Sequence, residues 1–141
     1  MNPLQQRLRG AFFPILHVLG MIVAVFGLAM LLPMAIAEFS GDPARHAFDE
    51  AVLLTAGAGI LIWLIGRPWK RELKARDGIL LVVLTWVLTP LFAALPLLIF
   101  LPQLSFTDAY FETMSGLTTT GATVLSGLDK LPGSINLWRA Q

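Results

Sequence analysis

Charged residues are distributed unevenly along the chain, and three long stretches contain none of them. No Asp, Glu, Lys or Arg occurs over residues 11–37, 51–66 or 78–101. A helix rises about 1.5 Å per residue and the hydrocarbon core of a bilayer is about 30 Å thick, so the first and third stretches are long enough to cross it. The second is shorter, but its helix is expected to begin near Ala44, inside the preceding polar loop. The pattern predicts three membrane-spanning helices.

Composition supports the same class of protein. Hydrophobic residues make up 56% of the chain and charged residues 13%, whereas a soluble domain is about a quarter charged. This composition excludes intrinsic disorder. A net charge of +1 without a basic stripe argues against a nucleic-acid partner, and the absence of cysteine excludes a disulfide framework. We expect an integral membrane protein whose first span is retained, because its apolar run is longer than that of a cleaved signal peptide.

The polar segments around the spans differ in charge, and this difference predicts their orientation. The amino terminus carries Arg7 and Arg9, whereas residues 38–50 contain Arg45 against four acids. The segment 67–77 is densely basic, with Arg67, Lys70, Arg71, Lys74 and Arg76. Because Lys and Arg are retained on the cytoplasmic side, we expect the amino terminus and the segment 67–77 in the cytoplasm. Topology alone explains the basic segment; docking of a regulator or of anionic lipid is the alternative.

The chain after the third span predicts a re-entrant pore loop. A short helix over Phe106–Met114, capped by Ser105 or Thr107, has about two turns and is too short to span. It is expected to end before residues 115–123, SGLTTTGAT, because glycine and β-branched residues disfavour helix. Non-helical backbone at membrane depth is tolerated only where it is buried or lines an aqueous cavity. An extramembrane loop that binds nothing is the alternative, and a phosphate-binding loop is disfavoured because no Lys follows.

The composition of this loop suits a monovalent cation. Potassium filters replace the water shell of the ion with backbone carbonyl oxygens, which threonine hydroxyls can supplement. Glycine, here Gly121, adopts the left-handed dihedrals that turn such carbonyls inward. The carboxyl end of the preceding helix is partially negative and favours a cation. Such a carbonyl site needs no carboxylate inside the membrane, and none occurs between Thr113 and Gly127.

The stretch FETMSGLTTTGATVLSGLDKLPGSINLWRAQ (residues 111–141) resembles the first pore loop of the TrkH/TrkG bacterial potassium uptake proteins, within the Trk/Ktr/HKT superfamily of cation transporters. The resemblance implies an all-α membrane protein with three transmembrane helices, a re-entrant pore helix and a filter loop. Residues 1–77 would form two extra helices and the basic cytoplasmic loop. Residues 78–141 would form a first membrane-pore-membrane repeat that stops before its second helix.

The resemblance also implies a set of site residues. The filter carbonyls would lie at Thr119, Thr120, Gly121 and Ala122, with Thr118 beneath them and K⁺ at the first three. Family members carry four such repeats in one polypeptide, so we expect this chain to be an amino-terminal fragment that supplies one quarter of a filter. Potassium-only and potassium-with-sodium selectivity stay open, as do channel-like and proton-coupled transport.

The implied setting is the bacterial inner membrane, crossed several times. The implied partners are the bilayer, the potassium ion, a cytoplasmic nucleotide-binding regulatory subunit and a second copy of the full-length protein. No cofactor is expected. An enzyme is not expected either, because no carboxylate pair, metal-ligand cluster or activated nucleophile stands out.

Two acids on the short helix, Asp108 and Glu112, are candidates for an outer-mouth patch that raises the local cation concentration. The alternative for Asp108, which we favour, is that it complements the helix dipole. The alternative for Glu112, weighted equally, is a bond to neighbouring loops or to the filter backbone.

Potassium transport is the first functional hypothesis. The second is a non-conducting truncated membrane fragment or a helix-packing module, for which Gly57, Gly59 and Gly66 offer a small-residue face on the second span. His17, inside the first span, is interpreted as a neutral residue near the membrane interface rather than a proton site.

Overall fold

The computed structural model describes the backbone of residues 3–69 and 72–140 and the side chains from Phe12 onward. Within these residues the protein is helical and contains no strand. Its elements are α1 (Pro3–Ala29), α2 (Leu31–Ser40), α3 (Arg45–Gly66), η1 (Arg67–Trp69), α4 (Ala75–Ala93), α5 (Leu95–Phe100), α6 (Phe106–Leu117), η2 (Leu128–Lys130) and α7 (Gly133–Ala140). The side chains of Arg7 and Arg9, and residues Lys70, Arg71 and Gln141, lie outside the described part.

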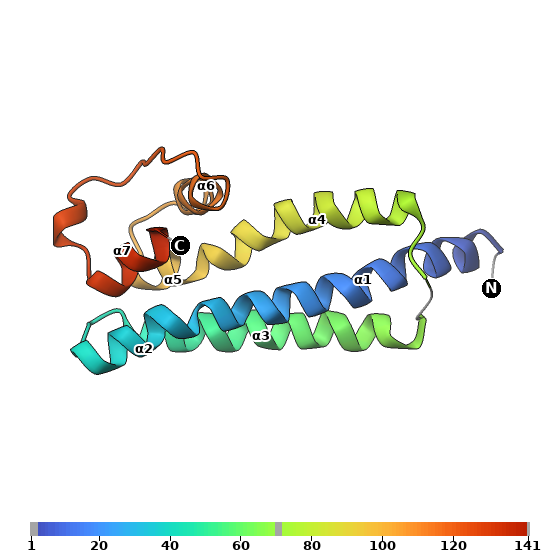
Figure 1. Ribbon diagram of the computed structural model, residues 1–141, viewed down its shortest axis with the longest axis horizontal. Helices are drawn as coiled ribbons and strands as arrows, with labels where there is room; N and C mark the ends of the chain where they lie inside the picture. The colour runs from blue at the N-terminus through green and yellow to red at the C-terminus, as the bar shows by residue number, and fades with distance from the viewer. Residues whose placement is uncertain (1–2, 70–71, 141) are drawn as a thin grey trace.

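Three helical stretches are long and apolar enough to cross a membrane, which confirms the predicted spans. They are Phe12–Ser40, Arg45–Trp69 and Ala75–Phe100. All three run along the long axis of the molecule (Figure 1). The second span begins at Arg45 with Ala44 as its N-cap residue, as its short apolar run required.

The first and third spans are each broken once, close to prolines at which the sequence predicts kinks. The first breaks at Met30 and the third at Ala94. Proline has no N–H to donate to the carbonyl four residues earlier. Pro33 and Pro96 therefore free carbonyls within one turn of each break, while Pro14 lies in an unbroken helix.

The helices α1 and α3 pack against each other through glycines. A Cβ atom at Gly20 would overlap the backbone of Trp63, and one at Gly59 or Gly66 would overlap the backbone of α1. Gly57, by contrast, has no atom within 4 Å of its Cβ position. The predicted small-residue face therefore packs at Gly59 and Gly66 but not at Gly57.

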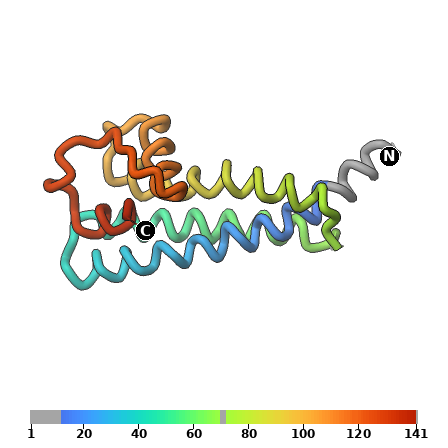
Figure 2. Tube along the Cα trace, turned by 45° about the horizontal axis from the view of Figure 1, so that its top comes forward, coloured from blue at the N-terminus to red at the C-terminus, as the bar shows by residue number. Residues whose placement is uncertain are grey.

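The elements after the third span gather at one end of the molecule. Figure 2 shows α6, the loop that follows and α7 at the same end of the molecule as the α2–α3 turn, with α7 next to the turn, while the carboxyl end of α3 lies at the opposite end. A buried apolar cluster at the α6–α7 end packs these elements against the three spans, and α1 reaches it through the partly buried Phe26. Phe48 and Leu97 lie at its centre without solvent exposure, and Ile135 brings α7 into it.

Candidate functional site

The helix α6 begins where the sequence predicted. Ser105 is its N-cap residue, and its hydroxyl accepts a hydrogen bond from the backbone N–H of Asp108 at 3.1 Å. The same hydroxyl donates to the Asp108 carboxylate at 2.7 Å. Asp108 thus sits in the first turn, where a negative charge complements the helix dipole. In Figure 1 α6 is seen nearly end-on, so it runs across the long spans rather than alongside them.

The end of α6 corrects one prediction. The helix continues to Leu117, three residues beyond the predicted Met114. Gly116 lies within this extension and packs close to α7, since a Cβ there would lie 3.2 Å from the carbonyl oxygen of Arg139. Thr118 then closes the helix, because its N–H and its hydroxyl both donate to the Met114 carbonyl, at 2.9 and 2.8 Å. The β-branched residue acts here as a C-cap and not as an interruption.

The loop after α6 has an alternating backbone. Thr119 has φ +54° and Gly121 has φ +73°. Positive φ suits glycine, but for a β-branched threonine it costs about 1–2 kcal/mol. Residues 118–124 are exposed, and the hydroxyls of Thr118 and Thr120 lie 2.8 Å apart. Strain held in an exposed loop is typical of functional segments.

The carbonyl of Ala122 differs from its neighbours because it accepts a hydrogen bond from the Ser115 hydroxyl at 2.7 Å. This bond ties the end of the loop back to α6. The loop's start is also tied down, since the N–H of Thr119 donates to Gly116 and that of Thr120 to Ser115, both at 2.9 Å. Of the five residues named from the sequence, Ala122 is the one whose carbonyl is engaged with α6.

Glu112 is buried and bonded to the segment that leaves the loop. The residue is 5% exposed, and its carboxylate accepts from the Thr123 hydroxyl at 2.9 Å and from the backbone N–H of Val124 at 3.1 Å. The Arg139 guanidinium donates to it through Nε at 2.7 Å and through a terminal nitrogen at 2.5 Å. This geometry is that of the second alternative raised for Glu112, a bond to the backbone beside the loop.

The helix α6 is attached to α4 near Pro90, which lies inside α4. The Thr113 hydroxyl contacts the carbonyl of Pro90 at 3.0 Å, and the Tyr110 hydroxyl donates to the carbonyl of Val87 at 3.1 Å. One turn further on, the Trp138 indole N–H donates to the carbonyl of Ala93 at 2.9 Å. Three carbonyls near the end of α4 therefore accept hydrogen bonds from α6 and α7.

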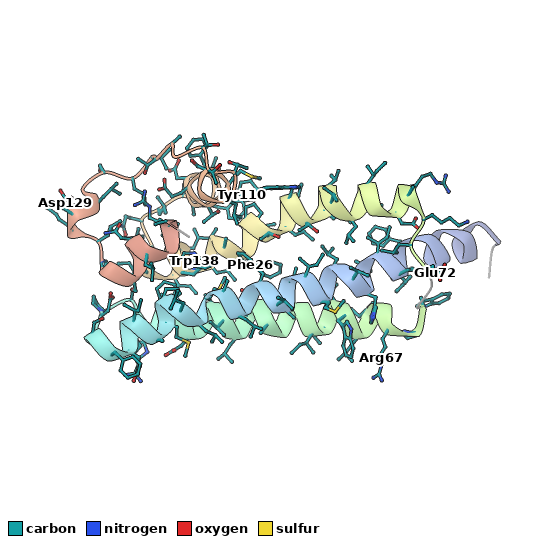
Figure 3. All side chains as sticks on the ribbon, in the orientation of Figure 1. Phe26, Arg67, Glu72, Tyr110, Asp129 and Trp138 are labelled. Atoms are coloured by element: carbon teal, nitrogen blue, oxygen red, sulfur yellow. The ribbon has the colours of Figure 1, made fainter. Side chains whose placement is uncertain are left out.

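Three residues outside the predicted site also support it. Trp138 packs its ring between α7 and the first two spans, tilted against Phe26 at 5.8 Å and edge-on to Phe48 at 6.5 Å between centroids (Figure 3). Asp42, in the α2–α3 turn, accepts from both the N–H and the hydroxyl of Ser134. The sequence signal was present, since an acid and a serine commonly cap helices, but their separation by 92 residues concealed it.

A cavity of about 310 Å³ lies behind α6, lined by Phe26, Ala29, Ala93, Glu112, Thr113, Gly116, Leu117, Trp138 and Arg139. None of residues 118–122 lines it, so the exposed loop is separate from this cavity. Over the described residues no group of three or more acidic, histidine or cysteine side chains could hold a metal ion. The oxygen atoms available to a cation in the loop are those of backbone carbonyls and threonine hydroxyls.

A model of the TrkH family, described as a cation transport protein, matches residues 45–141. The chain belongs to this family. Over 128 residues it is 44% identical to the Trk system potassium uptake protein TrkH of Halomonas elongata, covering 90% of this chain and 27% of that protein. It is 41% identical to TrkH of Escherichia coli K12 over 129 residues, which are 91% of this chain and 27% of that protein.

A solved member of the TrkH family has the same fold. The crystal structure of the potassium transporter TrkH from Vibrio parahaemolyticus matches with a TM-score of 0.83 at 42% identity, covering 91% of this chain and 28% of that one. The chain thus spans about a quarter of the length of the TrkH proteins that it matches. With three helices capable of crossing a bilayer, this TrkH-family chain is a multi-pass membrane protein.

Proposed function

We propose that this chain contributes one filter loop to a potassium transporter, with the carbonyl oxygens of Thr119, Thr120 and Gly121 as ligands and the hydroxyl of Thr118 beneath them. The observation that carries the proposal is the alternation of left-handed residues at Thr119 and Gly121. Such alternation turns successive peptide units so that their carbonyls face one side, as a site that replaces the water shell of K⁺ requires. Ala122 is left out of this set because its carbonyl accepts from Ser115.

The electrostatics of the loop support a cation. The carboxyl end of α6 leads directly into it, and a helix C-terminus carries a partial negative charge. The nearest carboxylate, Glu112, is paired with Arg139 and so adds little net charge. A site made of carbonyl dipoles without a free carboxylate binds a monovalent ion weakly enough for the ion to dissociate again, as conduction requires. The relatives, named as potassium uptake proteins, agree with this choice of ion.

We further propose that the α6 end of the molecule faces outward and the amino terminus faces the cytoplasm of a bacterium, across its inner membrane. Arg67 begins η1, and Lys74 and Arg76 lie at the start of α4. This end of α4 lies far from α6 (Figure 1), and Lys and Arg are retained inside. Family membership suggests a cytoplasmic nucleotide-binding regulatory subunit and a second copy of the full-length protein as partners.

A non-conducting role in helix assembly is the second candidate. The backbone contact of α1 with α3 at Gly59 and Gly66 favours it, because close small-residue contacts drive helix association in membranes. It predicts that the exposed loop can be altered without consequence for ion flux.

The experiment that separates these functions uses a chimera in which this chain replaces the matching segment of the Vibrio parahaemolyticus transporter. Flux of K⁺ and Na⁺ into proteoliposomes is compared for the chimera, Gly121→Ala and Gly127→Ala. Both glycines have positive φ, +73° and +69°, so both substitutions carry a similar backbone strain. We expect Gly121→Ala to lower the K⁺:Na⁺ flux ratio and Gly127→Ala to leave it unchanged. Equal ratios for all three proteins would refute the proposed function.

A further inference from the structure

A carboxylate in the turn between the first two spans is hydrogen-bonded to the filter-bearing part of the chain. Asp42 lies in the turn between α2 and α3, and one of its oxygens accepts from the Ala44 N–H at 2.8 Å. Its other oxygen accepts from the N–H of Ser134 at 3.1 Å and from the Ser134 hydroxyl at 2.9 Å. Ser134 is fully buried at the start of α7. Asp42 therefore caps α7 from 92 residues away, in the position where a helix dipole favours a negative charge.

The rest of α7 also packs against the same two spans, in addition to its bond to the Ala93 carbonyl at the end of α4. Ile135 is fully buried, and the Trp138 ring packs against Phe26 of α1 and Phe48 of α3. Figure 3 shows Trp138 and Phe26 together in the space between α7 and α1. The position of α7 thus depends on the amino-terminal helices at its first turn and at its last.

The last turn of α7 carries the residue that reaches the filter. Arg139 binds the Glu112 carboxylate, whose side chain is 3% exposed. Glu112 in turn holds Thr123 and the N–H of Val124, the residues that directly follow the filter loop. Arg139 also donates to the Thr123 hydroxyl at 3.2 Å. A continuous series of polar contacts and one short helix therefore joins Asp42 to the loop.

We infer that Asp42 is a positioning residue for the cation filter. By capping α7, it fixes the place of Arg139, and Arg139 with Glu112 fixes the backbone on which the loop ends. This gives the two amino-terminal helices a role in ion selectivity beyond packing. The inference rests on the proposed function, because it assigns to Asp42 an effect on the site described above.

Two features make this assignment specific to Asp42. Asp42 binds a residue outside the helical hairpin that α2 and α3 form, namely Ser134. Glu38 and Asp49 instead pair with Arg45 inside this hairpin, at 2.5 and 4.0 Å. In addition, the Ser134 group it binds is buried, so water does not readily replace the lost acceptor. A loose α7 would move Arg139 before it disturbed α6, which is attached independently to α4.

The test uses the chimeric transporter with Asp42→Ala, Asp42→Asn and the control Glu38→Gln, an exposed acid in the same turn region. Rb⁺ and Na⁺ fluxes are measured in proteoliposomes with equal amounts of monodisperse protein. We expect Asp42→Ala to lower the Rb⁺:Na⁺ ratio about fivefold, the population change that loss of one helix cap produces. Asp42→Asn keeps an acceptor for Ser134 and is expected to restore most of the ratio, while Glu38→Gln leaves it unchanged.

A second variant, Ser134→Ala, keeps the backbone bond to Asp42 and removes the hydroxyl bond, so it tests the same contact if Asp42→Ala is not recovered in folded form. We expect a smaller fall in the same direction. An unchanged ratio in Ser134→Ala and in every recovered Asp42 variant overturns the inference. Gly121→Ala, measured alongside, distinguishes failure of the positioning role from failure of the proposed function. If Gly121→Ala lowers the flux ratio while the Asp42 and Ser134 variants do not, the filter proposal is supported and the positioning role of Asp42 is refuted. If Gly121→Ala has no effect, the proposed function itself fails.

Discussion

Replacing glycine by alanine at two positions of α3, Gly57 and Gly59, is expected to change the stability of the protein in opposite directions, because only Gly59 contacts α1. An alanine at Gly59 places its Cβ 2.7 Å from the Cα and 2.9 Å from the Cβ of Ala24. Backbone atoms cannot rotate away, so the helices have to separate by about 0.5–1 Å, a gap at which contacting atoms lose a quarter to a half of their attraction. Overpacking of this kind costs about 1–3 kcal/mol.

An alanine at Gly57, two residues earlier, meets no atom within 4 Å. There the substitution removes backbone freedom from the unfolded chain and stabilises the helix by about 0.5–1 kcal/mol. The free energies of unfolding of the two variants should therefore differ by about 3 kcal/mol, with opposite signs relative to the parent. The assay is denaturant titration of the chain in mild detergent, followed by tryptophan fluorescence. Equal stabilities of Gly57→Ala and Gly59→Ala would refute the claimed backbone contact.

Three further predictions concern α7 and the filter. Trp138→Phe keeps the aromatic contacts but leaves the Ala93 carbonyl without its donor, so the same titration should show a loss of about 1–3 kcal/mol, and no loss would contradict that bond. Arg139→Gln leaves the Glu112 carboxylate buried without its cation and should cost about 3–5 kcal/mol, more than the double variant with Glu112→Gln; additive losses would contradict the pairing. The chain by itself in liposomes should carry no selective potassium flux, because one loop supplies only one of the carbonyl groups in each ring; selective flux would contradict a shared filter.

The spans and the start of the pore helix could be predicted from the sequence, because they follow from local properties. Absence of charge marks the three spans, and a serine three residues before Asp108 marks the cap of α6. Kinks near Pro33 and Pro96 were predicted, but the positions of the breaks were not: Met30 lies three residues before Pro33, and Ala94 two residues before Pro96. A proline indicates that a helix can break nearby, but the position of the break depends on how the surrounding helices pack.

The position of the loop after α6 could be predicted from the sequence, but the contacts that hold the loop in place could not. Glycine at position 121 indicated a left-handed backbone conformation there. Nothing in a run of three threonines indicates that Thr119 also adopts a positive φ. The two roles considered for Glu112 could not be separated, because its partner Arg139 lies 27 residues further on. The cap of α7 by Asp42 spans almost the whole chain. Such contacts depend on how the helices pack, which a pattern of residues along one chain does not specify.

The proposed function requires that the carbonyl oxygens of Thr119, Thr120 and Gly121 bind the transported cation. The anomalous scattering of Rb⁺ or Tl⁺ in crystals of the chimeric transporter, with this chain in place of the matching segment, locates the bound ion. We expect an ion peak on the pore side of the loop in contact with these carbonyls, and loss of that peak in Gly121→Ala. A peak bound elsewhere, with the carbonyls of residues 119–121 turned away from it, would show that these carbonyls do not bind the cation.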